Sequence, residues 1–94
     1  MKNKISIVTP TLNEKENIET FISKVKEEMA KLDYDYEHII IDNFSNDGTE
    51  QILKRIAKED NKIKLIFNSR NFGSVRSPYY GLLQASGDAV ILIN

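Results

Sequence analysis

The stretch that decides the fold is YEHIIIDNFSNDGT, residues 36–49. It contains three consecutive isoleucines, Ile39 to Ile41, and a continuous apolar run of this kind is typical of a strand covered on both faces of a sheet. The short polar side chains of residues 45–49 can cap the free amides at the start of a helix. Residues 36–42 are therefore predicted to form a central strand, followed by a helix.

Outward from this stretch, short β-branched runs alternate with longer segments in which apolar residues recur at helical spacing. Further strands are predicted at residues 4–9, 63–67 and 89–93. The first helix is predicted from the apolar stripe Ile18, Phe21, Ile22, Val25, Met29 and Leu32, and the second from Ile52, Leu53, Ile56 and Ala57. A third helix is predicted to begin at Ser77 and Pro78 and to end at Gly87. The order β-α-β-α-β-α-β predicts a Rossmann-like, doubly wound parallel sheet in a three-layer α/β sandwich.

Length and charge narrow the classes of protein. The 94 residues suffice for one small domain, and 13 basic against 14 acidic residues leave a net charge of -1. This balance argues against nucleic acid as a partner, because such proteins usually carry a basic surface. The chain has no cysteine, which excludes disulfides and thiolate chemistry, and its single histidine, His38, cannot form a zinc site alone.

No membrane segment is predicted. The first apolar run, residues 5–8, is far shorter than the core of a signal peptide, and no later run approaches the roughly 18 apolar residues of a spanning helix. We therefore expect a natural amino terminus and a cytoplasmic chain.

Candidate ligand-binding residues follow the strands, because ligands of doubly wound sheets lie beyond the carboxyl ends of the strands. Residues 9–14, TPTLNE, bring an amide and a carboxylate to this rim. Asp42 follows three isoleucines, and burying its carboxylate is costly unless a partner, such as a nucleotide base or ribose, satisfies it. Arg70 and Arg76 flank a glycine-containing turn, and guanidinium groups suit a diphosphate. Capped loops and solvated surface arginines are the alternative explanations.

Together and in this order, these segments resemble the amino-terminal half of family 2 glycosyltransferases, which have the GT-A fold. The matching motifs are Pro10-x-x-Asn13-Glu14, Asp42-Asn43-x-Ser45-x-Asp47-Gly48-Thr49, Asn71-x-Gly73 and Gly87-Asp88 before a strand. The segment Arg70-Asn71-Phe72-Gly73 is closest to polyprenyl-phosphate sugar transferases, similar to dolichyl-phosphate mannose synthases. Four positions depart from the pattern: Leu12 replaces an aromatic residue, Asn43 replaces an acid, Phe44 replaces a small residue, and Asn94 replaces the first acid of an Asp-x-Asp motif.

The resemblance implies a nucleotide-sugar site formed by Thr9, Pro10, Leu12, Asn13, Glu14, Asp42, Ser45, Arg70, Asn71, Gly73, Arg76 and Asn94. It implies that Asp42 hydrogen-bonds the base, that Ser45 shapes the adjoining loop, and that residues 70–73 close over the donor. The Asp-x-Asp motif of the family holds a divalent metal, Mg or Mn, which neutralises the leaving diphosphate. We expect no metal bound to this chain, and the general base of the family lies outside it.

The implied function is a glycosyltransferase of the hexosyltransferase type, acting in cell-envelope glycan biosynthesis. It would transfer a sugar from a UDP- or GDP-linked donor to a polyprenyl phosphate or a growing saccharide. Residues 1–94 are expected to be the amino-terminal nucleotide-sugar-binding part, truncated where the Asp-x-Asp motif begins. By itself this part should lack activity, and it should form a homodimer through the fourth strands or the third helices. The full-length parent would lie at the cytoplasmic face of the membrane.

Other nucleotide- and phosphate-binding classes fit less well. A dinucleotide-binding module needs Gly-x-Gly-x-x-Gly after the first strand, and a Walker loop needs Gly-Lys-Ser or Gly-Lys-Thr, neither of which occurs. A receiver-like domain needs an acid at the end of the third strand, where the sequence reads Phe67-Asn68-Ser69. A non-catalytic nucleotide-binding or interaction module remains the open alternative.

Overall fold

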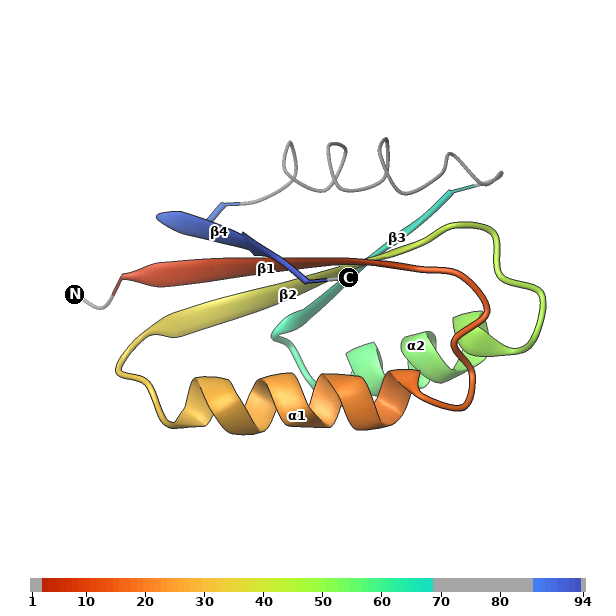
Figure 1. Ribbon diagram of the computed structural model, residues 1–94, viewed down its shortest axis with the longest axis horizontal. Helices are drawn as coiled ribbons and strands as arrows, with labels where there is room; N and C mark the ends of the chain where they lie inside the picture. Colours follow the sequence, from red (N-terminus) through yellow and green to blue (C-terminus); the bar gives the residue numbers. More distant parts are fainter. Residues whose placement is uncertain (1–2, 69–85, 94) are drawn as a thin grey trace.

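A parallel β-sheet carries two helices on one face (Figure 1). The computed structural model describes residues 3–68 and 86–93. The elements, in chain order, are β1 (Lys4–Thr11), α1 (Ile18–Ala30), β2 (Asp35–Asp42), α2 (Thr49–Glu59), β3 (Ile63–Phe67) and β4 (Ala89–Leu92). The strands lie in the order β3-β2-β1-β4, and every pair is parallel. The predicted α/β fold with a parallel sheet is confirmed, whereas the helix predicted for residues 77–87 falls mostly outside the described residues.

The main core lies between the sheet and the two helices. Its buried members are Ile18, Ile22, Ile40, Leu53 and Ile63. Of the apolar stripe predicted for the first helix, Ile18, Phe21 and Ile22 pack in this core, whereas Val25 and Met29 pack with Ile7 in a separate cluster. Leu32 is the exception. α1 ends at Ala30, where the amides of Lys31 and Leu32 close the last turn on the carbonyls of Glu28 and Met29. Leu32 therefore lies beyond the helix and is 49% exposed, so its assignment to the stripe was wrong.

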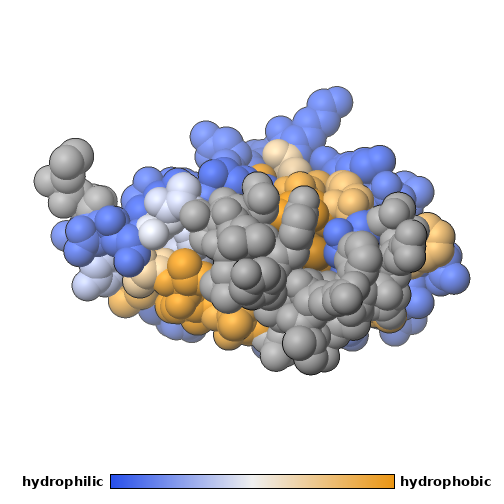
Figure 2. Space-filling view, turned by 90° about the horizontal axis from the view of Figure 1, so that it is seen from above, coloured by the Kyte–Doolittle hydropathy of each residue, from blue (hydrophilic) through white to orange (hydrophobic). Residues whose placement is uncertain are grey.

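A second cluster lies on the opposite face of the sheet. It contains Val8, Ile39 and Ile41, all buried, with Ile66 packed against them. Successive side chains of a strand point to opposite faces, so Ile40 faces the helices while Ile39 and Ile41 face away. The run of isoleucines is continuous because both faces of β2 are covered. Figure 2 views the molecule from this side and shows hydrophobic surface there.

β1 is longer than predicted. It continues through Pro10 and Thr11, which pair in register with Ile41 and Asp42 of β2. Proline cannot donate to a ladder and therefore suits strand segments with one free edge. β4 pairs only with residues 5–8 of β1, so among the described residues Pro10 has a strand neighbour only on the β2 side.

A buried carboxylate fixes the start of β4. Glu37 of β2 is 1% exposed and accepts hydrogen bonds from the Ser6 hydroxyl (2.5 Å), the Ser86 amide (2.8 Å) and the Lys64 ammonium. Burial alone would raise the pKa of Glu37, but these hydrogen bonds outweigh it and lower the pKa to about 2. Gly87 fits here because a Cβ at this position would lie 2.6 Å from the Ser6 hydroxyl oxygen.

His38 is buried as a neutral side chain in β2. One ring nitrogen, Nε2, lies 2.9 Å from the Thr9 hydroxyl, and the ring packs edge-on against Phe21. Burial lowers the pKa of His38 to about 4, although the Asp60 carboxylate partly opposes this. The prediction that His38 is a strand residue rather than a base agrees with this environment.

The depressed pKa of His38 predicts a pH-dependent stability. In the unfolded chain the imidazole protonates near its ordinary pKa of 6.5, whereas the folded state resists protonation until about pH 4. The stabilisation is therefore complete above pH 6.5 and is lost as the pH falls towards 4. Between pH 7 and pH 5, the free energy of unfolding measured with urea should fall by about 2 kcal/mol more in the native chain than in the His38→Gln variant. Equal losses in the two proteins would contradict the neutral, buried histidine.

The edge of β4 predicts self-association. Val90, Ile91 and Leu92 are all exposed, and β4 is an outer strand of the described sheet. Exposed apolar edge strands tend to pair with other chains. Sedimentation velocity at high concentration should therefore show a dimer or larger species, which Leu92→Lys should weaken. Leu32→Lys is the matched control, because Leu32 is similarly exposed but lies in the turn after α1; a monomeric native chain would contradict the prediction.

Candidate nucleotide-binding site

The candidate site is the rim formed by the loops that follow β1 and β2, residues 12–17 and 43–48. These loops leave neighbouring parallel strands at the carboxyl end of the sheet, where ligands of such folds bind. The two loops are hydrogen-bonded to each other by the residues that make up the two longest motifs of the sequence. The motifs therefore have a shared structural role before any ligand is considered.

Asp42 is at the centre of the rim. Its side chain is buried and accepts hydrogen bonds from the Thr11 hydroxyl (3.0 Å), the Ser45 amide (3.0 Å) and the Ser45 hydroxyl (2.5 Å). From the sequence, a ligand was expected to compensate the desolvation of this carboxylate. That reasoning was incomplete, because the chain itself provides three donors.

Asn13 and Ser45 join the two loops reciprocally. The Asn13 amide nitrogen donates to the Ser45 hydroxyl (2.8 Å), and the Asn13 side-chain oxygen accepts from the Asn46 amide (2.9 Å). Asn13 has a φ of 52°, in the left-handed region that asparagine adopts more readily than most residues. An asparagine at this position therefore satisfies both the backbone conformation and the contact between loops.

The start of α2 is tied to the same loop. The N-cap is Gly48, with a φ of 102°, and the preceding Asp47 accepts hydrogen bonds from the amide and hydroxyl of Thr49 (3.0 and 2.5 Å). Asp47 also accepts from the Lys15 amide, and the Thr49 hydroxyl accepts from the Glu14 amide. The hydrogen bond from the Thr49 hydroxyl lowers the pKa of Asp47, although burial opposes it. The predicted capping is thus achieved by Asp47.

The other predicted site residues are distributed less evenly. Thr9 is buried and bonded to His38, so it lies below the rim, whereas Leu12 and Glu14 are exposed in the loop after β1. Pro10 belongs to β1. The structure links Asn13 to Asp42 through Ser45, which is hydrogen-bonded to both. The remaining members of the prediction lie outside the described residues: Arg70, Asn71, Gly73, Arg76 and Asn94.

Two hollows border the rim. One, of ≈ 190 Å³, is lined by Thr9, Pro10, Thr11 and Glu14 together with Asn17, Ile18 and Phe21 of the α1 entrance. The other, of ≈ 280 Å³, is lined by Asp42, Phe44, Ser45, Glu50, Phe67 and Asn68. Both contain predicted site residues, and each is smaller than a typical drug-sized ligand pocket of about 300–1,000 Å³. They can hold parts of a ligand.

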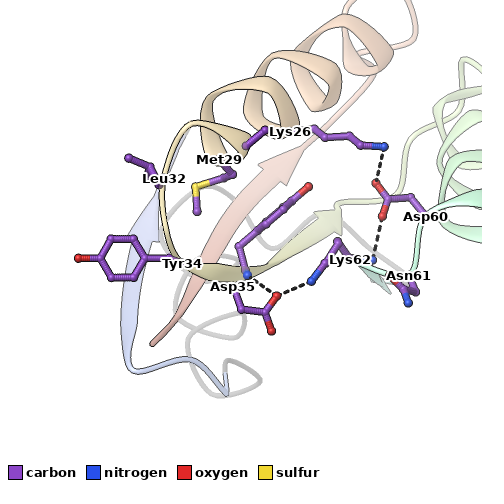
Figure 3. A pocket seen from close by; sticks show the side chains of 10 residues that line it. Lys26, Met29, Leu32, Tyr34, Asp35, Asp60, Asn61 and Lys62 are labelled. Carbon is purple, nitrogen blue, oxygen red and sulfur yellow. Dashed lines mark hydrogen bonds and ion pairs between the residues drawn. The ribbon is translucent and has the colours of Figure 1, made fainter. Parts of the chain in front are cut away.

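A larger groove of ≈ 730 Å³ lies at the opposite end of the sheet (Figure 3). It is bordered by the end of α1, the start of β2 and the turn before β3. Its charged side chains pair with each other, Lys26 with Asp60 (3.8 Å) and Lys62 with Asp35. It contains no predicted site residue and lies at the amino ends of the strands, so the rim is the better candidate despite its smaller hollows.

Sequence reasoning missed two side chains that organise the site and one that organises the other end of the sheet. Thr11 donates to Asp42, Asn68 donates to the Asn43 side chain (2.8 Å), and Glu37 anchors the segment before β4. Thr11 could have been found by extending β1 two residues, because it then lies directly opposite Asp42. The roles of Asn68 and Glu37 depend on contacts between strands, which a single sequence does not display.

Comparison with known proteins agrees with this geometry. The family model "Glycosyl transferase family 2" matches residues 6–94. The chain therefore belongs to glycosyl transferase family 2. It is 40% identical over 91 residues to the bactoprenol glucosyl transferase of Shigella phage SfV, covering 97% of this chain and 30% of that protein. It is 33% identical over 93 residues to the undecaprenyl-phosphate 4-deoxy-4-formamido-L-arabinose transferase of Proteus mirabilis (strain HI4320), covering 98% and 28%.

A solved structure supports the fold. The mannosyltransferase PcManGT from Pyrobaculum calidifontis, in complex with GDP-Man and Mn2+, superposes with a TM-score of 0.81 at 24% identity. The match covers 96% of this chain and 26% of that one. The chain thus spans less than a third of the length of these relatives, and it corresponds to part of a GT-A fold.

The contacts of Thr49 predict that removing its hydroxyl lowers the free energy of unfolding measurably. Thr49→Val keeps the shape of the buried side chain but leaves the Glu14 amide without its acceptor. The free energy of unfolding should fall by about 1–3 kcal/mol, as expected for an unsatisfied group. Thr20→Val, at an exposed position of α1, is the matched control and should change stability by no more than about 0.5 kcal/mol. Equal urea midpoints for the two variants would argue against a structural rim.

Proposed function

We propose that this chain is the nucleotide-binding part of an enzyme that transfers a sugar from a UDP- or GDP-linked donor to a polyprenyl phosphate or a growing cell-surface glycan. The observation that carries the proposal is the rim, in which two family motifs meet around Asp42 at the carboxyl end of the sheet. The identity to transferases named for bactoprenol and undecaprenyl phosphate supports the polyprenyl acceptor. The hexosyltransferase chemistry belongs to the full-length parent, and we propose that residues 1–94 alone are inactive.

Asp42 is proposed to hydrogen-bond the base of the donor. Thr11 and Ser45 donate to its oxygens from fixed positions, so the carboxylate is held in one orientation before a ligand arrives. A carboxylate oxygen can accept more than one hydrogen bond, and an N–H group of a base could therefore join this arrangement. Leu12 and Glu14, exposed in the neighbouring loop, would border the nucleotide.

A divalent metal, Mg or Mn, is proposed for the full-length enzyme, where it would neutralise the leaving diphosphate. Residues 3–68 and 86–93 contain no group of three or more acidic or histidine side chains able to hold a metal ion. The proposed metal is therefore not assigned to these residues.

The proposed location of the parent is the cytoplasmic face of the membrane. No helix in the described part of the chain is long and apolar enough to cross a membrane. The relatives named for bactoprenol and undecaprenyl phosphate motivate this location, since these acceptors are lipids.

The alternative is a nucleotide-binding or interaction module without turnover. Assaying the full-length parent with UDP- and GDP-linked sugars and polyprenyl phosphate distinguishes the two functions. Sugar transfer supports the proposal. Nucleotide binding without transfer to any lipid or saccharide acceptor favours the module.

Asp42→Asn is predicted to weaken binding of UDP or GDP to the chain about ten- to a hundredfold, because it removes a charged hydrogen-bond acceptor worth about 1.5–3 kcal/mol. Asp60→Asn is the control: Asp60 caps the end of α2, pairs with Lys26 and lies at the other end of the sheet. NMR titration measures both affinities, with NAD and acetyl phosphate as comparison ligands. Identical titration curves for the two variants would exclude Asp42 from the site.

A further inference from the structure

Phe44 is a bulky side chain at a backbone position that does not favour one. Its φ is 67°, in the left-handed region, where a bulky side chain is an outlier and glycine would fit without strain. The side chain is also 63% exposed, so it contributes little to the core. A residue that is both strained and exposed is a candidate for a role in binding.

The neighbours of Phe44 enforce this conformation. On one side, the Asn43 amide donates to the Thr11 carbonyl (2.9 Å), and on the other, the Ser45 amide donates to the Asp42 carboxylate (3.0 Å). The backbone is therefore fixed before and after Phe44. As a result, the ring is presented from the rim at a defined position.

A second aromatic side chain borders the same hollow. Phe67, the last residue of β3, is 37% exposed and lies in register with Asp42. The Lys54 ammonium lies 5.4 Å from the centre of its ring and is itself paired with Glu50 (3.2 Å). Phe44 and Phe67 thus line one hollow of ≈ 280 Å³ together with the polar side chains of Asp42, Ser45, Glu50 and Asn68.

We propose that Phe44 and Phe67 form an aromatic clamp that stacks on the nucleobase of the donor, while the polar side chains that line the same hollow set the preference for that base. This inference rests on the proposed function and names the residues that contact the base in addition to Asp42. Aromatic side chains stack on bases of every kind, while polar groups at the margin distinguish them. The hollow offers both, since its two rings are surrounded by carboxylate, hydroxyl and amide groups.

The occupant is a planar heterocycle rather than a lipid chain because of this polar margin. A prenyl chain has no hydrogen-bonding groups and would desolvate the part-exposed Glu50 carboxylate and Asn68 amide without giving them a new partner. A base presents N–H and C=O groups around its edge and can satisfy them. The volume of the hollow allows a single ring system but is below the range for complete ligands, so ribose and diphosphate would lie outside it.

The test combines affinity and stability. Phe44→Gly removes the ring and relieves the strained backbone, so the urea midpoint should stay the same or rise while the Kd for UDP or GDP increases at least about fivefold. Phe44→Leu keeps apolar surface without a π face and should also weaken binding, whereas Phe44→Tyr should restore it. Tyr34→Gly, which removes an exposed aromatic ring at the opposite end of the sheet, should leave the Kd unchanged.

Fluorine NMR of the chain labelled with 4-fluorophenylalanine identifies the occupant. The signals of Phe44 and Phe67 should shift with UDP or GDP and should not shift with ribose 5-phosphate, which lacks a base. If geranyl phosphate shifts these signals and the nucleotides do not, the hollow binds a lipid chain and the inference is wrong. A Phe44→Gly variant that binds nucleotide as tightly as the native chain would overturn the clamp but leave the proposed function intact. If the native chain binds neither UDP nor GDP, the clamp is wrong, whereas the proposed function is decided by sugar transfer by the full-length parent.

Discussion

The hydrogen bond from the Ser45 hydroxyl to the buried Asp42 carboxylate is the interaction on which the rest of the rim depends. A buried carboxylate requires donors, and Ser45 supplies two, from its hydroxyl and its amide. The same hydroxyl oxygen then accepts from the Asn13 amide and so determines where the loop after β1 lies. Through Asp47 and Thr49 the contact extends to the entrance of α2. One desolvated charge at the end of β2 therefore organises both loops.

β2 organises the other end of the sheet in the same way. Glu37 and Asp42 are five residues apart, an odd spacing, so their side chains point to opposite faces of the strand. Glu37 binds Ser6 of β1, Lys64 of β3 and the Ser86 amide before β4, and it thereby joins all four strands of the described sheet. A chain of this length has a modest core, and these two polar centres fix strand positions that apolar packing alone specifies less well. β2 thus contributes both to the apolar core and to the two polar centres that fix the strand positions.

The sequence predicted the elements well and the contacts between them poorly, for a physical reason. Periodicity within a segment reveals strands and helices, and it identified the isoleucine run of β2 and most of the α1 stripe. Leu32 continued that pattern by spacing alone, whereas the helix ends before it. The partners of Asp42 and Glu37 come from neighbouring strands, and register is a property of the sheet rather than of one segment. The motifs group Asp42, Ser45 and Asn13, which hydrogen bonds link in the structure, while Thr11 as a donor to Asp42 was not foreseen.

The internal contacts of the motif residues also change how such motifs are read. Asn13, Ser45, Asp47, Thr49 and Gly87 all have sufficient structural explanations in loop contacts, helix capping or close packing. A preorganised rim lowers the ordering cost of binding, so these residues can serve a ligand without touching it. Phe44 differs from them because its conformation and exposure oppose folding. A motif position occupied by a residue that the fold does not require is therefore the place where a contribution to binding can be separated from a contribution to folding.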